Sequence, residues 1–360
     1  MDRDHGRMPI AAGNESSFFL CNGTVWATGN NSKGRLGVGE DYIFCHKPTQ
    51  VAIESYIISV AAFGDFALLL DDNGRVYKFG TIYPEDKPIP IPEIIENVPI
   101  IVAIFVRHNG YFLIDCENSL WICGNSSHGA LGKLTNFDQY IPMQILPELI
   151  NIQQVSSGMY HSLFLDTDGR VWSCGDSQHG RLGQGIQRGS DRKILPIQNI
   201  PPMCMVSAGY DHSMFLDVDG RVWLCGWNFR RDKNRSELYY PEMVEEIFGI
   251  VLIHAAATAC FAVDEDGYVY HMGTSYNLNG ESSDGKTFLP VTQFTNIEYI
   301  ASGLWHVLFV EESGTVWSYG ENKSAQLGLG HCKQVEDAEQ ITLLPPVGAS
   351  ISRTKSARTH

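Results

Sequence analysis

The chain has 360 residues, of which 44% are hydrophobic and 35 are glycines, a composition typical of a packed globular protein rather than a disordered one. Its 26 Lys and Arg against 41 Asp and Glu give a formal net charge of −15. This balance disfavours binding to DNA or nucleosomes, because such binding depends on basic side chains that displace counterions from phosphates.

A pattern built around one glycine recurs along the chain. In its clearest copy, Val155 to Gly185, an apolar run leads into the turn Asp168-Gly169, a second run through Trp172, and a loop rich in glycine. Two short strands joined by a turn that favours positive φ are the predicted structure. The chain contains seven copies in all, at intervals of 44 to 51 residues, a length that suits a four-stranded unit. The anchor glycines are Gly29, Gly80, Gly124, Gly175, Gly226, Gly273 and Gly320, and the aromatic residues three positions before them are Trp26, Tyr77, Trp121, Trp172, Trp223, Tyr270 and Trp317.

Each unit has an apolar face that it cannot bury alone, so neighbouring units must stack, and a β array of this size closes into a ring. The sequence therefore predicts an all-β fold, a seven-bladed β-propeller in which the recurring aromatic residues fill equivalent interior positions. One domain is expected over residues 1–346, and the small, polar residues 347–360 are expected to form a flexible tail.

In chain order, the first three repeats differ mainly after the anchor glycine. Repeat one begins with the predicted inner strand Ile10 to Gly13 and should end with an outer strand at Pro48 to Val51. Repeat two replaces the glycine loop with residues 81–92, whose prolines predict an extended and exposed excursion. Repeat three has Asn118 in place of the turn glycine, the residue type that best tolerates the same left-handed conformation.

The later repeats include the largest departure from the pattern. Repeat five has the insertion Trp227 to Tyr240 where the glycine loop is expected, and repeat six has a polar segment at Asn277 to Lys286. Repeat seven returns to the pattern with Ser324 to Gly328, and Gln340 to Leu344 is the predicted last outer strand.

The cysteines indicate packing rather than disulfides or metal binding. Cys123, Cys174 and Cys225 fall in one equivalent position, just before the anchor glycine, where a small hydrophobic side chain is needed. No CxxC pair is present, so neither a metal site nor a cofactor is expected. The cysteines indicate a reducing compartment, and the first residues lack a secretory signal, so an intracellular protein, cytoplasmic or nuclear, is expected. The longest apolar run, Ile247 to Val263, suits buried strands, so no membrane span is expected.

Three motifs of the clearest copy, Ser157 to His161, Asp168 to Trp172 and Gly180 to Gly183, resemble the repeat of the regulator of chromosome condensation family. The resemblance extends from about Ile10 to Leu344 and implies a seven-bladed propeller. Members of this family include a nucleotide-exchange factor for the small GTPase Ran, scaffolds in ciliary and ubiquitin-ligase proteins, and a plant ultraviolet photoreceptor. The photoreceptor function is disfavoured here, because only Trp227 and Trp305 lie outside the recurring aromatic position.

The histidines His161, His212 and His306 occupy equivalent positions, fourteen residues before their anchor glycines. Such repetition favours a hydrogen bond that ties a strand to the neighbouring blade over a catalytic role. No Ser or Cys nucleophile lies at a matching position, so no hydrolytic triad and no catalytic residue is predicted.

Residues that break the repeat are the candidates for function. The resemblance implies that Asp211, in a GxDH turn, would contact a GTPase, and that the insertion would press on its phosphate-binding region. Glu15 and Asp65 are further acidic candidates, whereas the alternative for the insertion is a surface loop without function. The predicted partner-binding residues are Asp211, Trp227, Phe229, Arg230, Arg231, Asp232, Lys233, Asn234, Glu15 and Asp65.

Two functions follow from this reading. The first is a protein-protein interaction propeller, a monomeric scaffold or regulatory platform, because a rigid disc with variable loops is suited to binding. The alternative is a guanine-nucleotide exchange factor for a Ran-like or other small GTPase, which would displace nucleotide without covalent chemistry by binding the nucleotide-free state more tightly.

Overall fold

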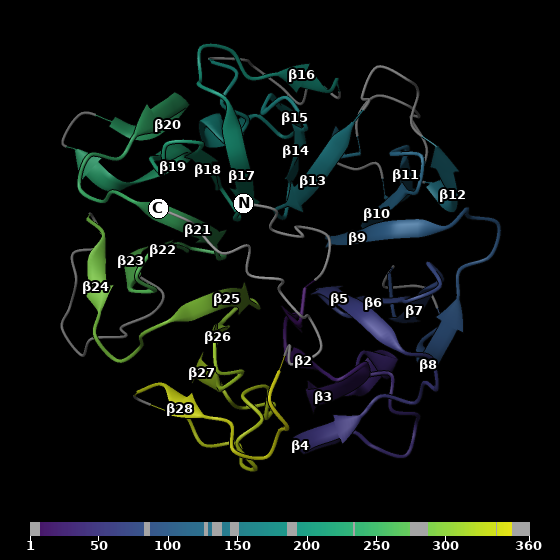
Figure 1. Ribbon diagram of the computed structural model, residues 1–360. Coiled ribbons are helices and arrows are strands. Elements are labelled where there is room, and N and C mark those ends of the chain that lie inside the picture. Colours follow the sequence, from purple (N-terminus) through teal and green to yellow (C-terminus); the bar gives the residue numbers. More distant parts are fainter. Residues whose placement is uncertain are drawn as a thin grey trace, which may run out of the picture.

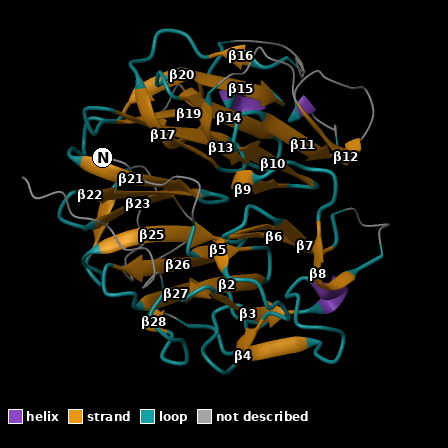
Figure 2. Ribbon diagram, turned by 45° about the vertical axis from the view of Figure 1, so that its right-hand side comes forward, coloured by secondary structure: helices purple, strands orange, loops and turns teal. Residues whose placement is uncertain are grey.

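The computed structural model describes residues 8–82, 87–125, 129–131, 139–144, 151–185, 193–232, 235–273, 287–335 and 337–347. In these residues, antiparallel strands form seven four-stranded sheets, arranged as blades around a central axis (Figure 1). The prediction of an all-β, seven-bladed propeller is confirmed. Strands dominate every part of the ring (Figure 2), and two short 3₁₀ turns, η1 (Ser32–Gly34) and η3 (Gln178–Gly180), lie in loops. Neither of these described turns approaches the length of a membrane-spanning helix.

The blades are numbered in chain order, and each is made of four consecutive strands. Blades 1 to 4 consist of β1 (Ile10–Ala12), β2 (Ser16–Cys21), β3 (Thr24–Asn30) and β4 (Phe44–Gln50); β5 (Ile57–Phe63), β6 (Phe66–Asp71), β7 (Val76–Gly80) and β8 (Ile89–Ile94); β9 (Ile101–Arg107), β10 (Gly110–Asp115), β11 (Leu120–Gly124) and β12 (Gln139–Gln144); and β13 (Ile152–Ser157), β14 (His161–Asp166), β15 (Val171–Gly175) and β16 (Leu195–Pro196). Blades 5 to 7 consist of β17 (Met203–Ala208), β18 (His212–Asp217), β19 (Val222–Asp232) and β20 (Arg235–Met243); β21 (Ile250–Ala255), β22 (Ala259–Asp264), β23 (Val269–Gly273) and β24 (Leu289–Val291); and β25 (Ile297–Ser302), β26 (His306–Glu311), β27 (Val316–Gly320) and β28 (Glu339–Gln340).

The second strand of each blade forms the densest part of the core. In β2, β6, β10, β14 and β18 every residue is buried, because neighbouring blades cover both faces of the strand. The middle of each of these strands therefore reads as a continuous apolar run rather than an alternating one, for example Leu163-Phe164-Leu165 in β14. Aromatic rings join adjacent blades edge to face, with centroids 5.4 Å apart for Phe112 and Phe164 and 5.6 Å for Phe261 and Phe309.

The hairpin between the second and third strands is closed by a carboxylate. In blade 4, Asp166 Oδ1 accepts hydrogen bonds from the backbone N–H groups of Asp168 and Arg170, both at 2.9 Å, and Gly169 has a φ of +79°. Asn118 takes the corresponding left-handed conformation at +60°, as predicted. The closing carboxylate was not predicted, although an Asp three residues before the turn glycine, or before Asn118, is visible in five of the seven repeats. The same bonds are made by Asp71, Asp115, Asp217 and Asp264.

The recurring aromatic residues pack against the core but are half-buried, which corrects the expectation that they fill the interior. The physical reason is their polar atom, which needs a partner. Trp223 Nε1 donates to Asp217 Oδ2 at 3.0 Å, and Trp121 Nε1 donates to Asp115 Oδ2 at 2.9 Å. The carboxylate that closes the hairpin thus also holds the aromatic ring.

The inner strands surround a central channel of about 340 Å³. Side chains join these strands where they diverge from one another. Gln154 bonds to both the N–H and the C=O of Val206 in the next blade, and Ser156 Oγ accepts from the N–H of Ala208 at 3.0 Å. These bonds satisfy backbone groups that no sheet partner reaches.

The ring closes without a shared strand, because each blade is continuous in sequence. Between blade 7 and blade 1, Ser17 Oγ bonds to His306 Nε2 at 2.8 Å and donates to the carbonyl of Gln326 at 2.6 Å. Between blades 4 and 5, Ser213 bonds in the same way to His161 and Arg181. The closing seam therefore uses the same hydrogen bonds as an internal seam.

Several predicted outer strands need correction. The outer strand of blade 1 is β4, which begins before Pro48, and part of the proline-rich segment of repeat two forms β8. The last outer strand is only Glu339–Gln340. Outer strands have one free edge and weak patterning, so their bounds are poorly specified by sequence. The polar segment 277–286 and residues 348–360 lie outside the described residues, whereas Val347 is buried and its N–H bonds to Gly314 O.

The antiparallel order gives the disc two faces. The turns between first and second strands and the loops between third and fourth strands share one face, here called the turn face. The hairpins between second and third strands and the connections between blades share the opposite face, here called the hairpin face. Glu15, Asp65, Asp211 and the repeat-five insertion all belong to the turn face.

Candidate functional site

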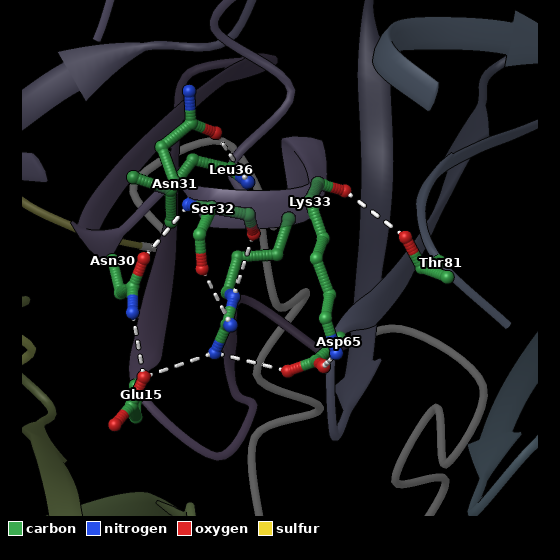
Figure 3. Close-up of polar contacts among 9 residues, drawn as sticks. Glu15, Asn30, Asn31, Ser32, Lys33, Leu36, Asp65 and Thr81 are labelled. Atoms are coloured by element: carbon green, nitrogen blue, oxygen red, sulfur yellow. Dashed lines mark hydrogen bonds and ion pairs between the residues drawn. The ribbon is translucent and has the colours of Figure 1, made fainter. Parts of the chain in front are cut away.

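Two of the predicted acidic residues meet at the seam between blades 1 and 2 (Figure 3). Glu15 lies in the β1–β2 turn and Asp65 in the β5–β6 turn, and both face Arg35 of the Gly34-Arg35-Leu36-Gly37 loop. Arg35 Nη1 is 3.2 Å from Glu15 Oε2 and 2.9 Å from Asp65 Oδ1, while Lys33 Nζ is 2.8 Å from Asp65 Oδ2. Three elements from two blades therefore converge on one guanidinium group.

The surroundings fix Arg35 in place. Its side chain is 7% exposed, and it donates from Nε to the carbonyl of Ser32 at 3.1 Å and from Nη2 to Ser32 Oγ at 3.0 Å. Asn30 Nδ2 donates to Glu15 Oε2 at 2.7 Å, so Glu15 is held from a second side. The carboxylates of Glu15 and Asp65 are thus oriented by the protein yet remain 44% and 22% exposed.

The third predicted acidic residue, Asp211, repeats this arrangement at the seam between blades 4 and 5. Arg181 of the equivalent Gly180-Arg181-Leu182-Gly183 loop has a side chain that is 2% exposed, and its Nη1 lies 3.0 Å from Asp211 Oδ1. Its guanidinium group lies 5.2 Å from the ring centroid of Tyr160, a cation–π contact. Asp211 itself is 40% exposed. The arginine of the loop is thus the partner that the sequence reading missed, although its repetition was visible.

The repeat-five insertion is an extension of blade 5 rather than a loop. Strands β19 and β20 continue past the blade as an antiparallel hairpin whose pairing reaches Asp232 opposite Arg235. At its base, the N–H of Trp227 donates to the carbonyl of Asp211 at 2.7 Å. The predicted residues Phe229, Arg230, Arg231 and Asp232 lie on β19, and Lys233 and Asn234 lie outside the described residues.

Side chains fasten the base of this hairpin to blade 4. His179 Nδ1 lies 2.7 Å from Glu237 Oε1 on β20, and the ring of Trp227 meets the ring of His179 edge to face at 5.4 Å. The hydroxyl of Tyr239 donates to the other carboxylate oxygen of Glu237. The hydrogen bonds from Tyr239 and His179 lower the pKa of Glu237. His179, Glu237 and Tyr239 were not predicted, because their contact depends on how two blades meet.

The structure therefore divides the predicted residues into two clusters. The first, here called the Arg35 cluster, consists of Glu15, Lys33, Arg35 and Asp65. The second, here called the Arg181 cluster, consists of Tyr160, His179, Arg181, Asp211, Trp227, Glu237 and Tyr239. The two clusters lie on well-separated sectors of the ring (Figure 1). The structure brings Asp211 and Trp227 together, and it brings Glu15 and Asp65 together, but the two pairs lie apart from each other on the turn face.

The predicted histidines lie inside the protein. His161 and His306 bond to serines of the next blade, at 2.7 Å from Ser213 and 2.8 Å from Ser17. Burial lowers the pKa of His212 and of His306 to about 4, and that of His161 well below its ordinary value, so these rings are neutral at physiological pH. Within the described ranges, no group of three metal-binding side chains occurs, and all nine cysteines are free thiols.

Comparison with known families agrees with the repeat pattern. A model described as Regulator of chromosome condensation (RCC1) repeat matches residues 22–70, 117–165 and 168–216, and a second model of the same description matches residues 152–181 and 206–231. The chain contains RCC1 repeats over these segments. The matched segments include the Arg35 loop, the Arg181 loop and Asp211.

Curated relatives carry the repeat in different settings. Over 306 residues the chain is 29% identical to the E3 ubiquitin-protein ligase HERC2 of Homo sapiens, a match that covers 77% of the chain but only 6% of that protein. It is 25% identical over 366 residues to the Regulator of chromosome condensation of Xenopus laevis, covering 92% of the chain and 76% of the relative.

Among solved structures, yeast RCC1 (Prp20) bound to Kap60 has the same fold. It superposes with a TM-score of 0.77 at 17% identity, covering 94% of the chain and 86% of that structure.

Proposed function

We propose that this RCC1-repeat chain is a protein-interaction propeller that binds its partner on the turn face, around the Arg181 cluster. The observation that carries the proposal is the position of the β19–β20 hairpin, the longest among the described blades, next to Asp211, whose carboxylate a buried arginine holds in place. At the base of the hairpin, the N–H of Trp227 donates to the backbone carbonyl of Asp211, a bond that equivalent residues of other blades also make. Carboxylate and hairpin therefore form one surface.

Two physical properties suit this surface to binding. Asp211 is fixed by Arg181 but partly exposed, so little side-chain freedom is lost when a partner contacts it. The hairpin also continues the backbone of β19 and β20 past the blade, which suits it to contact with a partner. The neutral, buried histidines, by contrast, suit packing between blades.

Capture of partners from a cell extract tests this surface. Protein carrying Arg230→Ala, Arg231→Ala and Lys233→Ala should lose the partners that the wild-type chain retains, as measured by quantitative mass spectrometry. Glu15→Ala with Asp65→Ala is the matched control on the Arg35 cluster and should retain them. Partners that survive the hairpin substitutions would place the binding surface elsewhere.

The second candidate is guanine-nucleotide exchange on a Ran-like or other small GTPase. It is favoured by the position of Asp211 beside the hairpin, the two features that the family resemblance associates with contact to the GTPase. The structure of Prp20p of Saccharomyces cerevisiae, which superposes with a TM-score of 0.70 at 20% identity, is described together with that protein's binding to Gsp1p and histones. Exchange would follow from tighter binding of the nucleotide-free GTPase, with no covalent step.

Release of fluorescent GDP from a panel of small GTPases tests exchange separately from binding. The chain should accelerate release from at least one GTPase, and Asp211→Ala should reduce that acceleration by about tenfold, equivalent to about 1.4 kcal/mol. Unchanged release across the panel would remove exchange while leaving the interaction platform intact.

The cellular setting that we propose is intracellular, nuclear or cytoplasmic. Its support is the set of nine free cysteines, which fits a reducing compartment.

A further inference from the structure

A second surface lies on the hairpin face, at the seam between blades 5 and 6. Residues 244–249 connect β20 to β21, and Phe248 in this connection is 75% exposed. The N–H of Ile250 bonds to Gly220 O, and the N–H of Glu265 bonds to Gly249 O, both at 3.0 Å. The backbone that follows Phe248 is therefore bonded to both the blade-5 hairpin and the blade-6 hairpin.

At other seams, a side chain of the connection between blades covers the hairpin glycine, and this side chain is missing at the blade 5–6 seam. A Cβ atom on the hairpin glycine Gly23 would lie 2.3 Å from the Tyr56 ring of the next connection, and one on Gly74 would lie 2.5 Å from Ile100. At the blade 5–6 seam the equivalent residue is Gly249, whose Cα lies 3.4 Å from a Cβ placed on Gly220. The nearest atom to a Cβ on Gly249 is Glu265 Oε1 at 3.9 Å, so space remains beside Phe248.

Carboxylates surround this apolar position. The three segments that meet here, 217–221, 244–250 and 264–268, contain seven Asp or Glu and a single Arg. Arg221 is already paired with Asp219 at 3.3 Å. Asp217 and Asp264 close their hairpins, whereas the other five carboxylates belong to exposed residues: Asp219, Glu245, Glu246, Glu265 and Asp266.

We propose that this seam docks a basic segment of a partner protein, with one apolar side chain of that segment packed on Phe248. The uncovered space beside Gly249 would receive the apolar side chain, and lysines or arginines on either side of it would pair with Glu245 and Glu265. The surface is on the face opposite to Asp211, so one disc can hold two partners at once, and this inference does not depend on the proposed function.

The test uses a short fluorescein-labelled peptide of lysines and arginines around one central leucine, with fluorescence anisotropy as the measurement. Wild-type protein should bind it, more weakly as salt rises. Phe248→Ser should weaken binding by about tenfold, as should Glu245→Gln combined with Glu265→Gln. A peptide with serine in place of leucine should show the same loss on the wild-type protein.

Matched controls separate this seam from general attraction to an acidic protein. Ile43→Ser removes a 70% exposed side chain from the turn face, and Glu54→Gln with Glu96→Gln removes two exposed carboxylates from other seams of the hairpin face. Both should bind the peptide within about twofold of wild type. Absence of binding to the wild-type protein, or equal losses in the seam variants and controls, would overturn the proposal.

Discussion

The Arg35 and Arg181 clusters are built from the same repeat element but are completed differently. In both, a buried arginine of a Gly-Arg-Leu-Gly loop pairs with the carboxylate of the next blade, at 2.9 Å for Asp65 and 3.0 Å for Asp211. Around Arg35, a second carboxylate and Lys33 complete a set of paired charges. Around Arg181, the ring of Tyr160 and the base of the β19–β20 hairpin stand where the Arg35 cluster has the second carboxylate and Lys33.

The comparison separates what the repeat supplies from what its departures supply. The arginine and its interblade carboxylate join blades in both clusters and are thus part of the scaffold. Only at blades 4 and 5 is this joint continued by a hairpin, which is why we assign recognition to the Arg181 cluster and a mainly structural role to the Arg35 cluster.

The largest expected effect comes from removal of the arginines. Arg35→Met should lower the free energy of unfolding by about 3 kcal/mol, because it leaves two neighbouring carboxylates without their shared partner and removes bonds to Ser32. Arg181→Met should cost about 2 kcal/mol, since it removes a similar bond to the carbonyl of Gln178 but only one carboxylate, that of the 40% exposed Asp211, loses an ion pair. Urea denaturation measures both. Equal or reversed costs would show that the two joints are not built as described.

A pH dependence is expected from His212, which directly follows Asp211 of the Arg181 cluster. In the Arg35 cluster the equivalent Asp65 is followed by Phe66, which does not titrate. Burial lowers the pKa of His212 from 6.5 to about 4, so unfolding takes up a proton between these values. Its contribution to stability is complete above pH 6.5 and falls, by about 1.4 kcal/mol per pH unit, as the pH drops toward 4.

Urea denaturation across this pH range, in wild type and His212→Gln, measures that contribution. The variant should show a shallower decline toward acid by about 1.4 kcal/mol per pH unit. The exposed His46→Gln is the control and should follow wild type. A variant as acid-sensitive as wild type would mean that His212 is already protonated in the folded protein.

The hairpin anchor should give a smaller effect, visible locally. His179 and Lys33 occupy equivalent left-handed positions, with φ of +59° and +65°. His179→Ala removes the contacts to Glu237 and Trp227 and should cost about 0.5 to 1 kcal/mol while speeding tryptic cleavage after Arg230 or Arg231. Cleavage at the wild-type rate would show that the hairpin is held by its backbone alone.

The smallest effect is expected from Lys33→Ala. Its side chain is 47% exposed, so loss of the 2.8 Å pair with Asp65 should change stability by less than about 0.5 kcal/mol. Tryptic cleavage within the hairpin should be unchanged, which makes this variant the control for His179→Ala. A cost above about 1 kcal/mol would mean that Lys33 is as necessary to its cluster as Arg35.

Much of the fold could be predicted from sequence because the repeat encodes local structure. The turn glycines and Asn118 obey constraints on φ that act within one hairpin. The half-buried state of Trp223 was missed because it depends on a bond to Asp217, and the short β28 was missed because an outer strand has little patterning.

The candidate site was only partly predictable for a related reason. Asp211 and the insertion could be picked out as departures from the repeat, and the structure joins them. Glu15 and Asp65 were grouped with them as acidic residues of corresponding turns, although repeats 1 and 2 lie apart from repeat 5 around the ring. The contact of His179 with Glu237 crosses a blade boundary, which no pattern within a repeat could encode.

The most direct test of recognition at the Arg181 cluster compares two carboxylates in the same assay. The affinity of a captured partner, measured by isothermal titration calorimetry, should fall by about tenfold or more with Asp211→Asn and by less than about twofold with Asp65→Asn. Equal affinities for the two variants, or a larger loss with Asp65→Asn, would contradict the assignment of recognition to blades 4 and 5.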